Sequence, residues 1–191
     1  MDGGNGITVQ AIADSHGCGV EIDESVDMYI LLGDNDGPWL YDLEYVSKRD
    51  GKPVLCVCGN HDDPSFPLWH PSFAYDGYCE YEGIRFCLVG GCLRREGETF
   101  PGDTQEGYFR RIGSMPECDV LVSHAPPYGI YEPCDFHHRG IRALAEKIRR
   151  EEPLLCLYGH MHTRRTDVFG KTTVRGIYMS ERLVVPFPGR A

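Results

Sequence analysis

Five short apolar runs, each followed directly by a polar residue, constrain the fold of this chain more than any other feature. The runs are rich in Val, Ile, Leu, Cys and Tyr, a composition typical of buried strands rather than helices. They cover residues 7–13, 27–33, 52–59, 118–123 and 154–159. Asp, Asn or His comes next in every case. Because ligands bind outside the carboxyl ends of the strands in open α/β sheets, these polar residues are predicted to converge in space.

Helices and hairpins are predicted around these runs. Residues 38–49 begin with a proline at a suitable first helical position. Residues 140–152 carry apolar side chains at the i, i+3, i+4, i+7 spacing of an amphipathic helix. Hairpins are predicted over residues 78–91 and 165–179. Strands that alternate with helices indicate an α/β layered fold, and residues 17–26 are barely long enough for a helical crossover, so we expect a mixed, irregular sheet.

Length and composition bound the class of protein. A chain of 191 residues, 41% hydrophobic and 25% charged, favours one soluble globular domain over residues 1–191. No apolar run approaches the roughly 20 residues of a membrane span, and the N-terminus lacks a signal-peptide core, so a cytoplasmic location is expected. The net charge of −10 disfavours long nucleic acid as a partner, although bound metal ions would still allow a phosphate-bearing substrate.

The polar residues at the strand ends have a coherent chemistry. Asp14 and His16 are two positions apart, and so are His160 and His162. An extended backbone would point both members of such a pair the same way. Carboxylate, imidazole and amide oxygen together suit Mn, Fe or Zn better than Ca or Mg alone. A single histidine is usually a surface or satisfied core residue, so only the complete set indicates a metal site.

Five motifs carry a resemblance to a known family. They are "ADSHG", "LLGDND", "CGNHDD", "VSHAPP" and "YGHMH", in this order along the chain. In that order they resemble the signatures of the calcineurin-like metallophosphoesterases, over residues 9–162. Each motif alone is weak, but the ordered set after five strands is specific.

The resemblance implies a fold and a metal centre. The fold is a four-layer αββα sandwich, in which two mixed β-sheets face each other between helices. The centre holds two divalent transition-metal ions, Mn²⁺, Fe²⁺/Fe³⁺ or Zn²⁺. The residues that would hold the first ion are Asp14, His16, Asp34 and His162. Those that would hold the second are Asp34, Asn60, His124 and His160, so that Asp34 bridges the two.

The resemblance also implies a reaction, the hydrolysis of phosphate esters. A hydroxide held between ions about 3.5–4 Å apart would attack phosphorus. His61 would be no ligand; it would face the substrate and protonate the leaving oxygen. Asp62 is placed to orient His61, and Asp63 is the competitor for that role.

Departures from the family pattern indicate the branch. The family's second motif is GDxxD, and its last position falls at Gly37 in this chain, while the nearby acid is Asp36. No Arg-Gly follows "GDND", and "GNHD" stands where the protein Ser/Thr phosphatases have "GNHE". The chain is more similar to the small phosphodiesterases, which include the mammalian metallophosphoesterase-domain proteins. A small phosphodiester is therefore the expected substrate. A phosphomonoesterase and a non-catalytic scaffold with this fold remain the alternatives.

The remaining histidines and charged residues fit no motif. Ordinary packing or surface exposure is the default for His70, His137 and His138, with a place at the rim of the pocket as the alternative for the last two. Arg164 is expected to be a solvated charge. Residues 63–78 are rich in proline and aromatics, and both a pocket wall and a packed surface loop remain open for them.

Overall fold

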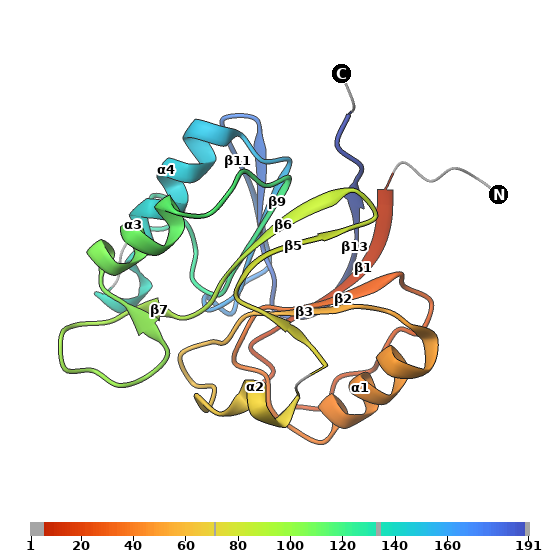
Figure 1. The fold of residues 1–191 in the computed structure, drawn as a ribbon. Helices are drawn as coiled ribbons and strands as arrows, with labels where there is room; N and C mark the ends of the chain where they lie inside the picture. The colour runs from red at the N-terminus through yellow and green to blue at the C-terminus, as the bar shows by residue number, and fades with distance from the viewer. Residues whose placement is uncertain (1–5, 71, 133–134, 190–191) are drawn as a thin grey trace.

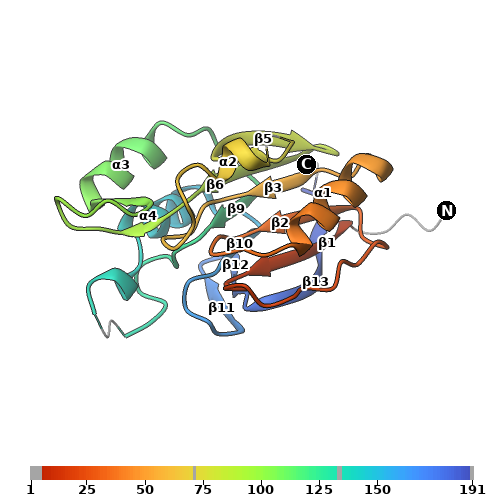
Figure 2. The same cartoon turned by 90° about the horizontal axis from the view of Figure 1, so that it is seen from below.

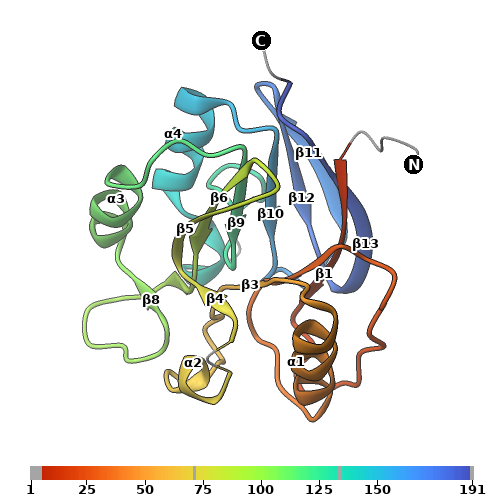
Figure 3. The ribbon, with the colours of Figure 1, turned by 45° about the vertical axis from the view of Figure 1, so that its right-hand side comes forward.

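Two β-sheets face each other in the computed structural model, which describes residues 6–70, 72–132 and 135–189. Helices α1 (Trp39–Asp50) and α2 (Phe66–Trp69) lie together on one side, beside β2 and β3. Helices α3 (Gln105–Gly113) and α4 (Arg142–Glu151) lie together on the other side, beside β6 and β9 (Figures 1 and 3). The view from below in Figure 2 separates the same two pairs of helices. The predicted sandwich of two mixed sheets between helices is confirmed.

The first sheet has five strands in the order β13-β1-β2-β3-β4. β13 runs antiparallel to β1, and the other neighbours are parallel. The bounds are β1 Gly6–Ala13, β2 Met28–Leu31, β3 Val54–Cys56, β4 Ala74–Tyr75 and β13 Met179–Pro186. The parallel step from β1 to β2 is made without a helix, as the length of residues 17–26 predicts.

The second sheet has six strands in the order β11-β12-β10-β9-β6-β5. The central pairs are parallel, while the outer pairs β11–β12 and β5–β6 are antiparallel hairpins. The bounds are β5 Gly77–Tyr81, β6 Ile84–Val89, β9 Val120–Ser123, β10 Leu155–Tyr158, β11 Arg165–Phe169 and β12 Thr172–Gly176. Both predicted hairpins are confirmed. A separate pair joins β7 (Cys92–Leu93) to β8 (Gly102–Asp103).

Apolar side chains on alternating faces of the strands build three layers of core. On β2, Met28 and Ile30 join the cluster between the sheets, and Tyr29 and Leu31 join the cluster under α1. A third cluster lies between the second sheet and helices α3 and α4. Strands buried on both faces need apolar residues throughout, which is why these segments read as continuous apolar runs.

The helices begin and end where local chemistry allows. Both predicted helices, over residues 38–49 and 140–152, are present as α1 and α4. α1 ends at Gly51, whose φ of 68° is left-handed and whose N–H donates to the Ser47 carbonyl. α3 was not predicted. Its start is fixed by Thr104, whose hydroxyl accepts a hydrogen bond from the Gly107 N–H at 3.1 Å.

β1 begins at Gly6 and β13 runs to Pro186. Among the described residues, no helix is both long and apolar enough to span a bilayer.

Candidate metal centre

The polar side chains that follow β1, β2, β3, β9 and β10 meet in one site. Two groups among them have ligand atoms that all lie within 4.8 Å of one another. One group is Asp14, His16 and His162, and the other is Asp34, His124 and His160. The structure thus brings together residues from five loops, as the strand ends predicted.

Tight left-handed turns, rather than extended backbone, aim these side chains. The φ angles are 54° at Asp14, 43° at His16, 54° at Asp34, 67° at His160 and 46° at His162. Such values are uncommon outside glycine and concentrate at binding and catalytic sites. The expectation that an extended backbone orients each pair is therefore wrong. The turn lets His162 join Asp14 while His160, two residues earlier, joins Asp34.

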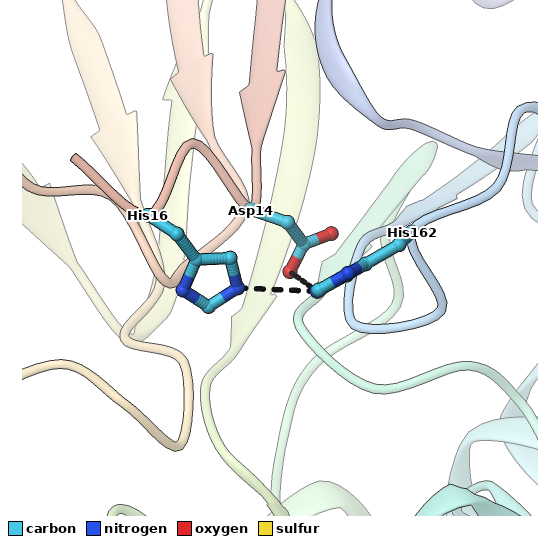
Figure 4. Close-up of side chains that lie close together, drawn as sticks. All are labelled: Asp14, His16 and His162. Atoms are coloured by element: carbon cyan, nitrogen blue, oxygen red, sulfur yellow. Dashed lines mark hydrogen bonds and ion pairs between the residues drawn. The ribbon is translucent and has the colours of Figure 1, made fainter. Parts of the chain in front are cut away.

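The first group is partly exposed. Figure 4 shows the side chains of His16 and His162 approaching each other next to the Asp14 carboxylate. The Nε2 atoms of His16 and His162 are 3.1 Å apart, and His162 Nε2 is 3.9 Å from Asp14 Oδ1. Two nitrogens at this distance with a carboxylate beside them form a set of donors directed at a common point.

The second group is buried. His124 Nδ1 lies 2.7 Å from the Leu32 carbonyl oxygen, to which it donates. Its Nε2 then carries the lone pair, since a neutral imidazole has one protonated nitrogen. That Nε2 lies 3.0 Å from Asn60 Oδ1 and 3.5 Å from Asp34 Oδ2. Asn60 is thus placed beside the second group.

Asp34 lies between the two groups. Its Oδ2 is 4.0 Å from His16 Nε2 in the first group and 3.5 Å from His124 Nε2 in the second. Its Oδ1 accepts a hydrogen bond from the His61 N–H at 2.7 Å. One carboxylate therefore faces both groups and also anchors the backbone of His61.

The electrostatics of these side chains fit divalent cations. Among the described residues, Asp14 Oδ2 and His160 Nε2 are buried without a hydrogen-bond partner. Burial, reinforced by the charge of Asp34, raises the pKa of Asp14 to about 8. Burial lowers the pKa of His160 to about 2, with His124 adding to the effect. Neutral imidazoles and a destabilised carboxylate are a donor set that a cation stabilises.

Two glycines allow the loops to approach one another. A Cβ on Gly33 would lie 2.5 Å from the Gly59 nitrogen and 2.6 Å from His124 Nδ1. A Cβ on Gly59 would lie 2.0 Å from Asp34 Oδ1. The glycine before Asp34 and the one before Asn60 are therefore required by packing around the Asp34 carboxylate.

A comparison with protein families identifies the group to which this arrangement belongs. The family model of the calcineurin-like phosphoesterases matches residues 8–164. The chain belongs to this family. Comparison with the curated proteins gives no match.

Solved structures share the fold. The protein TT1561 of Thermus thermophilus matches with a TM-score of 0.63 and 16% identity, over 91% of this chain and 90% of that one. Phosphopantetheinyl hydrolase from Mycobacterium tuberculosis matches with a TM-score of 0.57 and 16% identity, over 92% and 91%. A putative 5'-nucleotidase from Staphylococcus aureus matches with a TM-score of 0.58 and 13% identity, over 92% of this chain and 50% of that one. At these identities the likeness shows the fold.

Asp62 does not have the contacts expected of it. Its Oδ2 accepts the N–H groups of Gly59 at 2.7 Å and Asp34 at 2.9 Å, and its Oδ1 accepts that of Asn35 at 3.1 Å. Burial raises the pKa of Asp62 to about 6 against these bonds. The carboxylate fastens two family motifs to each other instead of turning the His61 ring. Its competitor Asp63 accepts hydrogen bonds from Ser65 within its own turn.

His61 stands at the mouth of the site. Its side chain is exposed, and its ring lies edge-on to His16, with the ring centroids 5.3 Å apart. It lines a pocket of about 660 Å³. The pocket is lined by Asp34, Asn60, His61, Cys92, Phe100, His137, His138, His160, Met161 and His162. The lining thus combines residues of the family motifs with residues outside these motifs.

The pocket-lining residues outside the five motifs were not predicted as part of the site from the motifs. His137 and His138 lie at the pocket, so the rim position is the correct one of the two alternatives. Phe100 and Cys92 join them from the segment after β6. The only sequence signals for these lining residues are the glycine pair that follows β6 and the "HAPPYG" loop that leads to the two histidines.

The other open residues are now placed. His70 is buried, stacks on Phe73 and lies 3.1 Å from Glu44, so packing is the right reading for it. Arg164 is exposed and donates to the carbonyls of Tyr178 and Ser180. Within residues 63–78, Asp63, Phe66 and Trp69 line a smaller hollow of about 250 Å³, which His61 also lines.

Proposed function

We propose that this chain hydrolyses phosphate esters with two divalent transition-metal ions, and that its substrate is a small phosphodiester. The observation that carries the proposal is the pair of ligand groups around one carboxylate, Asp34, beside a pocket of about 660 Å³. Manganese is the proposed metal, and the cytoplasmic location stays a prediction.

The ligand assignment follows the two groups. Asp14, His16, Asp34 and His162 would hold one ion, and Asp34, Asn60, His124 and His160 the other. When bound, such ions neutralise charge on the phosphate oxygens and lower the pKa of a coordinated water. The protein supplies the fixed donors, a partly enclosed pocket and a proton for the leaving group.

His61 is the proposed proton donor. Its backbone N–H is tied to Asp34 and its ring is exposed beside His16. The ring therefore stays at the metal centre while remaining free to contact a substrate. An imidazolium at this position would protonate the leaving oxygen as the bond to phosphorus breaks. Asp62 supports this step indirectly, because it holds the loops that carry Asp34 and Asn60.

Two features favour a diester over a monoester. The pocket is large enough for an organic group in addition to the phosphate, since ligand sites typically have about 300–1,000 Å³. Phe100, His137 and Met161 give it rings and an apolar side chain to contact that group. A diester also keeps only one negative charge on its non-bridging oxygens. It then depends more on proton donation to the leaving group, which His61 is placed to give.

The test compares two chromogenic substrates with the same leaving group. We expect kcat/KM to be higher for bis-p-nitrophenyl phosphate than for p-nitrophenyl phosphate, both with Mn²⁺, and chelation to abolish both activities. A clear advantage for the monoester would overturn the diester preference and leave the metal centre intact. A purified protein that binds no metal would support the scaffold alternative instead.

A further inference from the structure

The His138 side chain is held in place from two sides. Its Nδ1 donates to Asp135 Oδ2 at 2.6 Å. Its ring stacks on the ring of His160, with centroids 4.6 Å apart and an angle of 17° between the planes. The residue lies in a short 3-10 turn, His137–Arg139, outside every family motif. A stacked contact of this kind fixes the plane of both rings.

The turn itself is anchored. Asp135 Oδ1 accepts the backbone N–H groups of His137 at 2.9 Å and His138 at 3.1 Å. His137 Nδ1 lies 2.8 Å from the Leu93 carbonyl, which ties the turn to β7. The loop closes through a bridge between Pro127 and Ile141. His138 is therefore presented by a turn that is anchored at Asp135 and at β7.

The orientation of the His160 ring decides where its donor nitrogen lies. A hydrogen bond joins the His160 ring to the backbone of His137, in the same turn as His138. His160 Nε2 is buried and has no hydrogen-bond partner among the described residues. The χ2 torsion of a histidine is soft, and the lone pair of Nε2 lies in the ring plane, so rotation of the ring moves the donor. The His124 ring contacts His160 edge-on at 62°, with the centroids 4.9 Å apart, so His138 provides the parallel contact along the face of the ring.

We propose that His138 is a positioning residue for His160, and through it for the metal ion of the buried group; this rests on the proposed function. Stacking restricts the His160 ring to the orientation in which one of its nitrogens lies within 4.8 Å of the ligand atoms of Asp34 and His124. The entropy of ordering that ring is then lost in folding rather than in metal binding. The side chain acts by its flat shape, so an aromatic ring without nitrogen atoms serves the same purpose.

A Mn²⁺ titration of the purified chain tests this, with electron paramagnetic resonance to count the free ion at one fixed pH. His138→Ala weakens one of the two binding steps by about tenfold, in the range for lost support of a metal-bound histidine, and leaves the other unchanged. His138→Phe keeps the stack and restores the affinity. Arg139→Ala, an exposed neighbour on the same turn, is the matched control and leaves both steps unchanged. Far-UV circular dichroism verifies that each variant is folded.

The outcomes separate this inference from the proposed function. If His138→Ala binds Mn²⁺ in both steps with the affinities of the wild-type chain, the positioning role is overturned. This holds even if KM rises, because His138 would then only line the pocket. A His138→Phe variant as weak as His138→Ala also overturns it, since the ring nitrogens would then be what counts. A wild-type chain that binds no divalent transition metal overturns the proposed function itself, and the positioning role with it.

Discussion

The two ligand groups differ in their exposure to solvent. Asp34, His124 and His160 are all buried, whereas in the other group Asp14 is buried and His16 and His162 are exposed. The buried group also has supported rings, with His124 bonded to the Leu32 carbonyl and His160 stacked on His138. One ligand group is thus buried and has supported rings, and the other is open to solvent at two of its three side chains.

From this difference we expect the two proposed metal positions to behave differently. In a shielded site each electrostatic interaction is stronger, because the surroundings are less polarisable than water. In the exposed site water competes for the ligands, and exchange is easier. We therefore expect the buried group to retain its metal and the exposed group to be the one that loads and releases metal during handling. The predictions below test this comparison, starting with the largest effect.

Asp34→Asn should have the largest effect because it removes the carboxylate that faces both groups. Both affinities should fall by more than the roughly 10–100-fold that follows the loss of a ligand's hydrogen-bond partner, and hydrolysis should be nearly lost. Metal analysis after gel filtration measures the first effect and a phosphate-ester assay the second. Asp36→Asn, an exposed carboxyl two positions further on, is the matched control and should keep both metals. Loss of metal from one group only would show that Asp34 does not bridge.

His61→Ala should separate catalysis from metal binding. The side chain belongs to neither ligand group, so both metals should stay bound, while the rate falls by about 10²–10⁴, the usual range for general acid–base catalysis. Steady-state kinetics together with the metal content of the same sample provide the measurement. If the variant lost metal, His61 would be a ligand and the proposed role would have to be abandoned.

Removal of metal by a chelator should occur in two phases. The fast phase should come from the exposed group and the slow phase from the buried one, because solvent reaches His16 and His162 directly. Stopped-flow mixing of the Mn²⁺-loaded chain with excess chelator gives the two rates. His162→Ala should remove the fast phase alone, and His160→Ala the slow phase alone. A single phase in the wild-type chain would contradict the difference between the groups.

The smallest expected effect lies at the other end of β9, away from His124. Arg85 donates to both oxygens of Asp119, at 2.8 and 3.0 Å, and these bonds lower the pKa of Asp119. Since the folded pKa lies below the unfolded value of about 3.9, the pair stabilises the fold above that pH. The contribution is lost as the pH falls through the lowered pKa. Arg85→Met should therefore lower the free energy of unfolding above this pH by about 1 kcal/mol or less, as is usual for a partly exposed pair. At lower pH the variant and the wild-type chain should converge in stability.

Urea unfolding at a series of acid pH values measures this last effect. The Mn²⁺ affinities of Arg85→Met should equal those of the wild-type chain, because the pair is at the far end of the strand. An altered affinity would show that the metal centre depends on the whole sheet rather than on its own loops.

Much of the site could be predicted because strands and motifs coincide. An apolar run that stops at Asp14 or His124 predicts a buried strand with a polar residue at its carboxyl end. The layer order needed the family resemblance, since periodicity does not say which sheet a strand joins. Helix α3 escaped prediction because only Gly107, Tyr108 and Ile112 are buried on it, too few for a clear periodic pattern.

The parts that sequence reasoning missed depend on side-chain direction and on loops. Asp62 follows His61 in the chain, yet its carboxylate points to the backbone of Gly59, Asp34 and Asn35. Adjacency in sequence suggested that Asp62 contacts His61, but the Asp62 carboxylate faces the backbone of other residues. His138 stacks on His160. The sequence separation of these two residues fits no motif or periodic pattern, so the contact is visible only in the folded structure.

The three hydrogen bonds to Asp62 also bear on how this protein is assembled. They are made between protein atoms, and they join the loop after β2 to the loop after β3. The cradle around Asp34 is therefore held together by the protein's own hydrogen bonds. We therefore expect the metal-free chain to be already folded around Asp34 and to take up divalent metal without refolding.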